Sequence, residues 1–517
     1  MSAMDRAANL ARLRDEDFDV LVIGGGATGA GIALDAAARG LRTALVEAGD
    51  FASGTSSRST KLVHGGVRYL ERAVTHLDRA QFRLVREALA ERATLLGIAP
   101  HLVHPLRTVV PAYSLRDAIF YRTGLWMYDR AAGAAGIGRS RYLSRAEMLR
   151  AFPGLRRKGL RGGVAYYDGQ FDDARMNVTL VASAAAAGAA VVNYAYVTGF
   201  ARSDGHIRGA AVRDMIGGEA VDVRARCVVN ATGPFADTVR RMADPAARPM
   251  MKPSRGTHLA FDADWAPHGD ALLIPRTPDG RVLFVTPWEG SVIAGTTDEP
   301  APAASTPHPT EAEIDYLFEQ LGHWFDPPPG RDDMRSSWAG LRPLIADPEA
   351  GGNTAKLVRE HHIEVGKGGL VTIAGGKWTT YRLMAEETLD RVVADNDFDA
   401  RPCSTRERPL LGAEGYSEDL AVTLAERHGL PGDVAAHLAH AYGGRAEELL
   451  SLAPAAANAR LAEGHPYIEA EVVWAAGREM ALTTEDVLAR RLRLAFIDRD
   501  AANAARPRVE ELLANAR

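Results

Sequence analysis

The sequence predicts an α/β fold built from a parallel-sheet domain, a mixed α+β domain and an all-helical C-terminal domain. The chain has 517 residues, whereas single hydrophobic cores stop growing at about 250–300 residues, so several domains are expected. Short apolar runs end in glycine turns at three widely separated places, near residues 23, 229 and 374, which is typical of buried parallel strands. From about residue 415 the chain is rich in Ala, Leu and Glu at helical spacing.

The composition narrows the class of protein and of partner. Hydrophobic residues make up 46% of the chain and charged residues 25%, which is typical of a soluble globular protein. The chain has 61 basic and 66 acidic residues, a net charge of −5. Because this gives no overall basic field, we expect no nucleic-acid partner. Two cysteines, Cys227 and Cys403, cannot build a disulfide framework or a four-thiolate site, so no metal is expected.

The first element is a strand–turn–helix–strand unit between residues 20 and 47. The apolar run 20–23 reads as a strand buried on both faces of a sheet. Small residues from 30 to 38 form a helix that Gly40 can end. Residues 43–46 then form a second buried strand.

Three glycines between that strand and helix, Gly24, Gly26 and Gly29, satisfy the G-x-G-x-x-G pattern. They permit a tight turn, close approach to a pyrophosphate and close helix–strand packing, while the helix N-terminus favours the anion. Glu47 ends the second strand about twenty residues later, where a carboxylate receives ribose hydroxyls. The context predicts a Rossmann-like dinucleotide site rather than a glycine-rich turn with a surface glutamate.

Two later turns decide between NAD and FAD. One, at Gly233, follows an apolar strand, and another, at Gly375, Gly376 and Lys377, follows a strand near the end of the sheet domain. One strand end can then hold the adenosine, while a distant one places a helix N-terminus beneath an isoalloxazine ring. This layout favours FAD and a domain of the glutathione-reductase type.

Insertions divide the FAD-binding domain. We expect it to comprise residues 15–95, 155–250 and 356–395, a mixed α+β substrate-binding domain at 96–154 and 251–355, and a helical domain at 400–517. An antiparallel hairpin is expected at 282–294, on either side of Trp288-Glu289-Gly290.

The most unusual stretch is TSSRSTKLVHGGVRYLE at 55–71. The alternative is an ordinary Ser-rich loop, but two glycines behind a histidine indicate close approach to a flat ligand. With this stretch, the chain strongly resembles the FAD-dependent glycerol-3-phosphate dehydrogenases, the bacterial aerobic and mitochondrial enzymes. The other matching features are IGGGATGAG at 23–31, NATGP at 230–234, IAGTTD at 293–298, GLRPL at 340–344 and GGKWTTYR at 375–382.

The resemblance implies non-covalent FAD and a set of residues that bind it. These are Gly24, Gly26, Gly29, Glu47, Thr55, Ser56, Ser57, Lys61, Leu62, His64, Gly233, Gly375, Gly376, Lys377 and Thr379.

Cations are expected around a small dianionic substrate. Arg342 lies in an apolar setting, and its planar guanidinium suits bidentate recognition of phosphate. The alternative for each arginine is an ion pair with a nearby acid. The resemblance implies that the substrate is held by Arg68, Tyr69, His258, Arg342, Arg359 and Lys377.

Two histidines compete for the proton chemistry, His64 in the glycine-rich loop and His258 beyond the second turn. A histidine of near-neutral pKa can take a hydroxyl proton as hydride leaves the same carbon. The sequence does not separate these roles, so His64, His258, Arg342 and Lys377 are all candidate catalytic residues.

The family's activity is the oxidation of sn-glycerol 3-phosphate to dihydroxyacetone phosphate, with hydride passing to FAD and electrons to membrane quinone. The alternatives are an oxygen-using glycerol-3-phosphate oxidase, another amino-acid or 2-hydroxy-acid oxidase of the same flavoprotein superfamily, and a flavoprotein scaffold or sensor without turnover. The oligomeric state is left open, with a homodimer among the alternatives.

Quinone reduction requires contact with a bilayer, and we expect a peripheral protein at the cytoplasmic face of the inner membrane. The first twenty residues contain no apolar core of signal-peptide length, so no signal peptide is expected, and no apolar run reaches the ~18 residues of a spanning helix. The candidate lipid surface is 115–141, and the alternative is an internal helix. The apolar residues of segment 115–141 are Ile119, Phe120, Tyr121, Leu125, Trp126, Met127 and Tyr128. The arginines among and after them are Arg116, Arg122, Arg130, Arg139 and Arg141.

Overall fold

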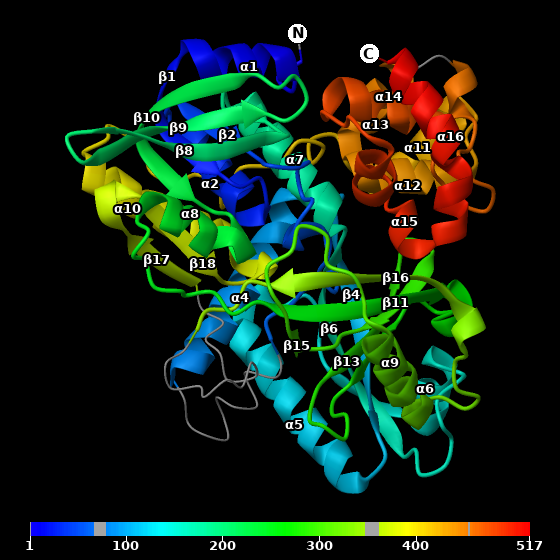
Figure 1. Ribbon diagram of the computed structural model, residues 1–517. Coiled ribbons are helices and arrows are strands. Elements are labelled where there is room, and N and C mark those ends of the chain that lie inside the picture. The colour runs from blue at the N-terminus through cyan, green and yellow to red at the C-terminus, as the bar shows by residue number, and fades with distance from the viewer. Residues whose placement is uncertain (1, 67–78, 347–360, 453–454, 517) are drawn as a thin grey trace.

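The computed structural model describes residues 2–66, 79–346, 361–452 and 455–516. A smaller sheet with its helices lies at the upper left of Figure 1, and the helical C-terminal region lies beside it at the upper right. A larger sheet lies below both. These are the three kinds of structure that the sequence predicts, so the expected fold class is confirmed.

The smaller sheet is mostly parallel. Its strands, in spatial order, are β17 (His361–Val365), β18 (Val371–Gly375), β10 (Ala220–Asn230), β1 (Asp17–Ile23), β2 (Thr43–Val46) and β7 (Ala190–Val192), and the hairpin of β8 (Ala195–Ser203) and β9 (His206–Asp214) joins β10. Because β1 pairs in parallel with both β10 and β2, the carboxyl ends of these strands meet at one edge, where ligands of such sheets bind.

Helices cover both faces of this sheet. They are α1 (Arg6–Asp15), α2 (Ala27–Ala38), α7 (Asp173–Ala186), α8 (Ala236–Ala243) and α10 (Tyr381–Asn396). The helices α2, α7 and α10 pack on the face that carries Val20 and Val22. On the other face, Leu21 and Ile23 pack with α1, α8 and the β8–β9 hairpin. The predicted unit of strand, glycine turn, helix and strand is confirmed by β1, α2 and β2.

The larger sheet is mixed. Its strands are β15 (Glu299–Pro300), β11 (Ser254–Asp262), β14 (Ser291–Gly295), β13 (Leu283–Trp288), β12 (Ala271–Ile274), β4 (Val103–Ala112), β6 (Gly162–Phe171) and β3 (Leu62–Val63), with β16 (Met334–Arg342) paired to β11 and β5 (Arg141–Ser144) to β6. Its helices are α4 (Arg79–Ile98), α5 (Leu115–Ala132), α6 (Arg145–Ala151) and α9 (Glu311–Trp324). The expected hairpin is present, since β13 and β14 pair antiparallel.

One predicted domain boundary is wrong. Residues 155–171 were expected in the FAD-binding domain, but β6 pairs with β4 along its whole length, from Val103 opposite Phe171 to Ala112 opposite Gly162. The strand β3 pairs with the end of β6, so the segment 15–95 also contributes to the larger sheet. A strand buried on both faces reads the same in either sheet, so its pattern does not identify its partner.

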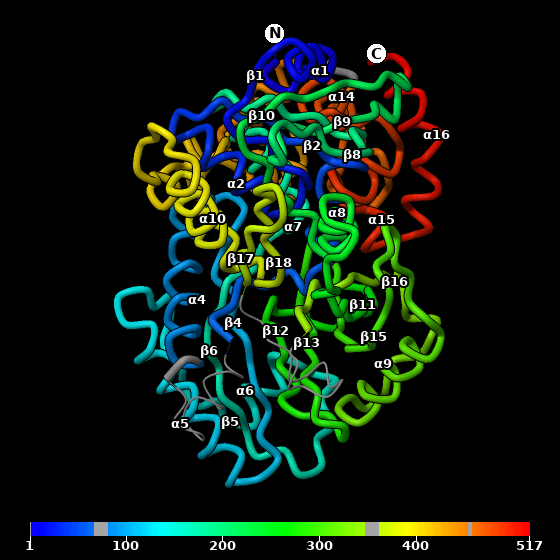
Figure 2. The backbone as a smooth tube through the Cα atoms, turned by 60° about the vertical axis from the view of Figure 1, so that its left-hand side comes forward, coloured from blue at the N-terminus to red at the C-terminus, as the bar shows by residue number. Residues whose placement is uncertain are grey.

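The C-terminal region is helical, as expected, and packs against both sheet domains. It contains α11 (Leu420–His428), α12 (Gly432–Tyr442), α13 (Ala446–Leu452), α14 (Glu469–Arg478), a π-helical turn (Asp486–Arg491), α15 (Leu494–Ile497) and α16 (Arg499–Asn515). Its apolar core continues into the larger sheet through Trp288 and Trp338. Both termini lie at the end of the molecule opposite α5 in Figures 1 and 2.

Candidate functional site

A cavity of about 820 Å³ lies between the carboxyl edge of the smaller sheet and the strands β11 and β16 of the larger one. Four turns of the smaller sheet reach it, those that follow β1, β2, β10 and β18. Most of the sequence-predicted site residues line it, namely Gly24, Gly26, Glu47, Thr55, Ser56, Leu62, His64, Gly233, His258, Arg342, Gly375, Gly376, Lys377 and Thr379. The structure therefore brings together residues that are more than 350 positions apart in the chain.

The glycine turn after β1 needs its glycines for two different reasons. Gly24 has φ of +110°, and a Cβ there would lie 2.6 Å from the carbonyl oxygen of Ala231. A Cβ on Gly29 would lie 1.8 Å from the carbonyl oxygen of Gly24, so this glycine lets α2 pack on the turn and does not itself line the cavity. Because α2 begins at Ala27, its N-terminal N–H groups face the cavity end of β1, which suits a pyrophosphate.

Glu47 connects the glycine turn after β1 with the loop after β2 through two hydrogen bonds. Its Oε2 accepts a hydrogen bond from the N–H of Gly25 at 2.6 Å, and its Oε1 accepts one from Gly49 at 2.9 Å. Burial raises the pKa of Glu47, and these backbone donors oppose the rise. The carboxylate thus fixes the position of the glycine turn while its residue lines the cavity.

At the other end of the cavity, the turn after β18 is tied to the hydroxyl-rich loop. The indole Nε1 of Trp378 donates to the carbonyl oxygen of Ser56 at 2.9 Å. The N–H of His64 donates to Oγ1 of Thr379 at 3.2 Å. Lys377 lines the cavity immediately before a short 3₁₀ turn, Trp378–Thr380. Two motifs that are separated by over 300 residues therefore form one wall.

Arg342 lies at the end of β16, where it lines the cavity and forms an ion pair with an acidic residue. Its guanidinium donates to Oγ1 of Thr296 at 3.2 Å and to the carbonyl oxygen of Thr297 at 3.0 Å, and it pairs with Asp298 at 3.2 Å. The side chain is half-buried. These contacts hold the guanidinium in a fixed orientation, which is what recognition of a planar or tetrahedral anion requires.

His258 is buried in β11, and Arg342 lies on the neighbouring strand β16. Its Nε2 lies 3.0 Å from Oγ1 of Thr60, and its ring stacks on Trp338 of the neighbouring strand. Burial lowers the pKa of His258 well below its ordinary value, and the positive charges of Lys61 and Arg342 add to the effect. The imidazole is therefore neutral near pH 7 and able to accept a proton.

Three of the expected cofactor residues, Gly29, Ser57 and Lys61, do not line the cavity. Lys61 does not line the cavity, because its Nζ is fully buried at 2.8 Å from Asp173 and at 2.8 Å from the carbonyl oxygen of Ser57. Ser57 is also buried and turned away from the cavity. Three expected substrate residues, Arg68, Tyr69 and Arg359, lie outside the residues that the structure describes.

Sequence reasoning missed Thr60 and Trp338, which both contact His258. Trp338 lies four residues before Arg342 in an extended strand, so the two residues occupy the same face. That spacing was the available signal. The spacing alone does not identify the contact with His258, because that contact depends on the pairing of β16 with β11. This pairing places Trp338 directly opposite His258 and Arg342 opposite Ser254.

The helix α5 has one packed face and one exposed apolar face. Leu125 and Tyr128, which were both expected at the candidate lipid surface, are instead buried in the protein. The exposed fractions of Leu115, Ile119, Phe120 and Trp126 are 73%, 61%, 51% and 54%. The guanidinium of Arg130 lies 5.0 Å from the centre of the Trp126 ring. None of the described helices is both long and apolar enough to span a bilayer.

Comparison with known proteins identifies two family regions. Residues 19–382 match the model of the FAD dependent oxidoreductases, and residues 403–517 match the C-terminal domain of alpha-glycerophosphate oxidase. The chain is 45% identical to the mitochondrial glycerol-3-phosphate dehydrogenase of Rattus norvegicus over 98% of its own length and 72% of the relative. The mitochondrial glycerol-3-phosphate dehydrogenase of Arabidopsis thaliana is also 45% identical, over 98% of this chain and 84% of the relative.

Solved structures give the same picture. The glycerol-3-phosphate dehydrogenase from Bacillus halodurans, complexed with FAD, superposes with a TM-score of 0.79 at 31% identity, over 99% of this chain and 94% of the other. An L-alpha-glycerophosphate oxidase from Mycoplasma pneumoniae with FAD bound has a TM-score of 0.56 at 17% identity, over 76% and 98% of the two chains. At that identity the second likeness shows the fold alone.

Proposed function

This chain belongs to the family of FAD-dependent glycerol-3-phosphate dehydrogenases, and on that premise we propose how its residues carry out the oxidation of sn-glycerol 3-phosphate to dihydroxyacetone phosphate. The resemblance carried by the sequence motifs is confirmed, as is FAD as the cofactor. When bound, FAD supplies the acceptor for the hydride that leaves C2 of the substrate.

The residues at the cavity fit FAD. The two glycines at 24 and 29 create a turn that a Cβ would fill, at the N-terminus of α2. Glu47 lies at the end of β2, where a ribose would be received. The cavity then continues to Gly375 and Gly376, which have φ of +76° and +77° and present backbone rather than side chains. These features support the pyrophosphate and adenosine at one end and the flavin ring at the other.

The observation that carries the catalytic proposal is that a neutral imidazole and a guanidinium line the same cavity. His258 and Arg342 lie on neighbouring strands and both line the cavity. We assign to Arg342, with Lys377, the binding of the substrate's anionic and hydroxyl oxygens. His258 takes up the C2 hydroxyl proton at a ring nitrogen, which its low pKa permits because the imidazole is neutral. Thr60, at 3.0 Å from Nε2, orients the ring.

The route of the electrons is part of the proposal. We assign them to membrane quinone, and we place the protein peripherally at the cytoplasmic face of the inner membrane. The support is the exposed apolar face of α5, with Arg116, Arg122 and Arg130 around it. Aromatic and aliphatic side chains beside arginines are typical of a helix that lies in the interface of a bilayer.

Anaerobic absorbance spectra of the purified protein test the activity. Glycerol 3-phosphate is expected to bleach the visible flavin band, while an amino acid or a 2-hydroxy acid leaves it unchanged. Bleaching by an amino acid instead would transfer the chain to the amino-acid oxidases. A spectrum that no substrate changes would leave a flavoprotein scaffold or sensor. Re-oxidation of the bleached protein by a short-chain quinone faster than by oxygen separates the dehydrogenase from the oxidase.

A further inference from the structure

Two consecutive loops of the FAD-binding domain form much of the cavity wall. The first follows β2 and comprises residues 47–54, and the second is the hydroxyl-rich loop 55–60. Residues 47–49, 52–56 and 58–60 line the cavity. Asp50, Phe51 and Ser57 do not, and all three are buried on the other side of the loops. The contacts of Asp50 and Ser57 therefore show which residues support the loops on the side away from the cavity.

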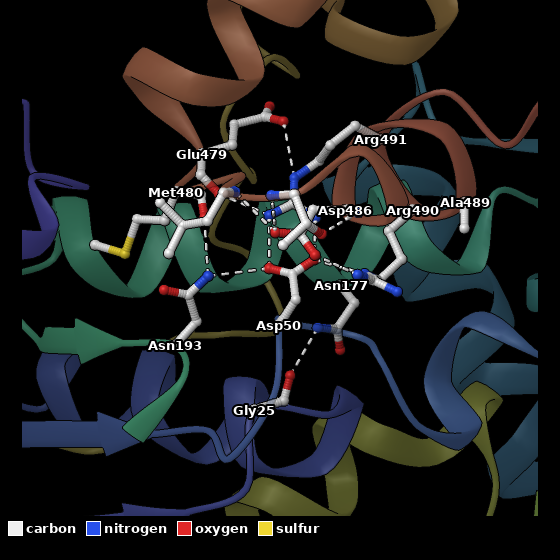
Figure 3. Close-up of polar contacts among 12 residues, drawn as sticks. Gly25, Asp50, Asn177, Asn193, Glu479, Met480, Asp486, Ala489, Arg490 and Arg491 are labelled. Atoms are coloured by element: carbon white, nitrogen blue, oxygen red, sulfur yellow. Dashed lines mark hydrogen bonds and ion pairs between the residues drawn. The ribbon is translucent and has the colours of Figure 1, made fainter. Parts of the chain in front are cut away.

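Asp50 is held by two arginines of the C-terminal helical domain (Figure 3). Its Oδ2 accepts from Nε of Arg490 at 2.6 Å and from Nη1 of Arg491 at 2.7 Å, and its Oδ1 accepts from Nη2 of Arg491 at 3.0 Å. Asn193 donates to the same Oδ1 at 3.1 Å and also to the carbonyl oxygen of Met480 at 2.8 Å. The carboxylate is thus enclosed almost entirely by donors, and most of them come from residues 490 and 491.

Arg493, two residues further on, holds the second loop. Its Nη2 donates to the carbonyl oxygen of Ser57 at 2.6 Å and to Asp173 at 3.2 Å. Lys61 donates to that same Ser57 carbonyl and pairs with the same carboxylate. The guanidinium lies 4.2 Å from the ring centre of Phe496, which comes from α15 of the helical domain. The short segment 490–493 therefore contacts the back of both cavity loops.

The helix α7 extends this contact to the glycine turn. Asn177 of α7 donates to the carbonyl oxygen of Gly25 at 2.8 Å, as Figure 3 shows. Two residues earlier on α7, Arg175 donates to the carbonyl oxygen of Arg491 at 3.0 Å and pairs with Glu479. A movement of the helical domain would therefore be transmitted to all three segments that surround the adenosine end of the cavity.

The loops need such support because parts of them are in uncommon conformations. Ala52 has φ of +64° and Lys61 has φ of +62°, a region that residues other than glycine rarely occupy unless their surroundings impose it. The buried charges also cannot separate freely, because removal of one partner leaves the other uncompensated.

We propose that Arg490, Arg491 and Arg493 are positioning residues that hold the two loops in the FAD-binding arrangement, so that the C-terminal helical domain controls FAD affinity. The proposal rests on the assignment of this cavity to FAD. Linkage is reciprocal, so FAD binding must in turn stabilise the contact between segment 490–493 and the loops. A contact that merely adds stability would be formed equally with and without FAD.

The test uses the full-length holoprotein and two readouts. FAD dissociation constants are measured by recovery of flavin fluorescence on dilution for wild type, Arg491→Met and Arg491→Lys. We expect Arg491→Met to raise the constant by about tenfold or more, since a charge-assisted bond to Asp50 is lost. Arg491→Lys keeps the charge without the two-pronged geometry, and an intermediate rise is expected.

The matched control is His437→Gln in the same domain. The side chain of His437 is 8% exposed, and its Nε2 lies 2.7 Å from Glu471. Its Nδ1 lies 3.9 Å from Glu289 of the β13–β14 hairpin, which is not a cofactor loop. Its melting temperature without FAD is expected to fall, as that of Arg491→Met does, while its FAD dissociation constant stays at the wild-type value. Equal loss of FAD affinity in both variants would overturn the proposal.

Hydrogen exchange of wild type supplies a test that does not depend on any variant folding. Amides of residues 479–493 are expected to exchange more slowly with FAD bound than without it. Unchanged exchange there, in a protein that binds FAD, would reject the coupling and leave the cofactor assignment intact. A wild type that binds no FAD would instead reject the cofactor assignment itself.

Discussion

The imidazole of His258 stacks on the indole of Trp338, with ring centres 4.1 Å apart and planes inclined by 15°. The ammonium of Lys61 lies 4.4 Å from the centre of the Trp338 ring system. A buried cation thus stands close to the residue that we assign as the proton acceptor. Its charge is one reason why the pKa of His258 is low.

The first prediction concerns the pH dependence of turnover. Burial lowers the pKa of Lys61 to about 7, although Asp173 opposes this, so Lys61 is protonated in the acidic range where His258 takes up a proton. Replacement of Lys61 by Met removes that charge and raises the pKa of His258. The acidic limb of the kcat profile is therefore expected to move to higher pH. Arg39→Met removes a buried cation that pairs with Asp35 instead, and an equal movement there would refute the assignment.

A second prediction concerns stability below neutral pH. The pKa of His258 is depressed in the folded protein, so the unfolded chain binds more protons once pH falls below about 6.5. The free energy of unfolding should therefore decline from that pH downward, by at most about 1.4 kcal/mol per pH unit from this residue. Urea unfolding of wild type and His258→Asn across pH 4.5–7.5 measures it, and parallel curves would contradict the shift.

The glycine turn offers a third prediction, in which two substitutions have different effects. Gly26 has φ of −78°, which valine tolerates, and its Cβ would meet Oγ of Ser56 at 2.9 Å. Gly26→Val is therefore expected to fold but to lose FAD. Gly29→Ala places a Cβ 1.8 Å from the carbonyl oxygen of Gly24, so it should cost about 1–3 kcal/mol of stability. Full FAD content in folded Gly26→Val would show that the pyrophosphate binds elsewhere.

The sequence was most informative where structure and chemistry are local. The glycine turn, Glu47 and the flanking strands lie within about thirty residues, and their spacing alone determines which groups meet. The turn at Gly375 was predicted for the same reason, since a buried strand followed by two glycines and a helix can be recognised without knowing its neighbours.

The predictions that failed depended on distant partners. Lys61 directly follows two hydroxyl residues, Ser59 and Thr60, and looks like a ligand of the cofactor. Its φ is +62°, and its ammonium lies at Asp173, which is 112 residues later, rather than at the cavity. The contact between Asp50 and Arg490 joins residues that are 440 positions apart. The sequence around Lys61 and around Asp50 contains no local pattern that distinguishes a buried ion pair from a surface charge.

A fourth prediction concerns the substrate phosphate. Arg342→Lys keeps one positive charge but loses the fork that contacts Thr296, Thr297 and Asp298. Loss of one charge-assisted bond costs about 1.5–3 kcal/mol, which corresponds to a roughly ten- to hundredfold fall in kcat/KM for glycerol 3-phosphate. The melting temperature should change little, because the side chain is half-buried. Unchanged kinetics would remove Arg342 from the substrate site.

The last prediction concerns the membrane and depends on which side of α5 each residue occupies. Ile119, Phe120 and Trp126 are exposed, so their joint replacement by serine should leave the fold and the flavin spectrum intact. Burial of each side chain in a bilayer is worth up to about 1.5–3 kcal/mol, so the triple variant is expected to lose co-sedimentation with anionic liposomes. Leu125 was also expected at this surface but is buried in the protein. Leu125→Ser is therefore the contrasting variant, which should lower the melting temperature while the folded fraction still binds liposomes. If wild type does not co-sediment with liposomes, the exposed face of α5 is not a membrane surface. If it also reduces oxygen faster than quinone, the protein acts as an oxidase rather than as a quinone-linked dehydrogenase.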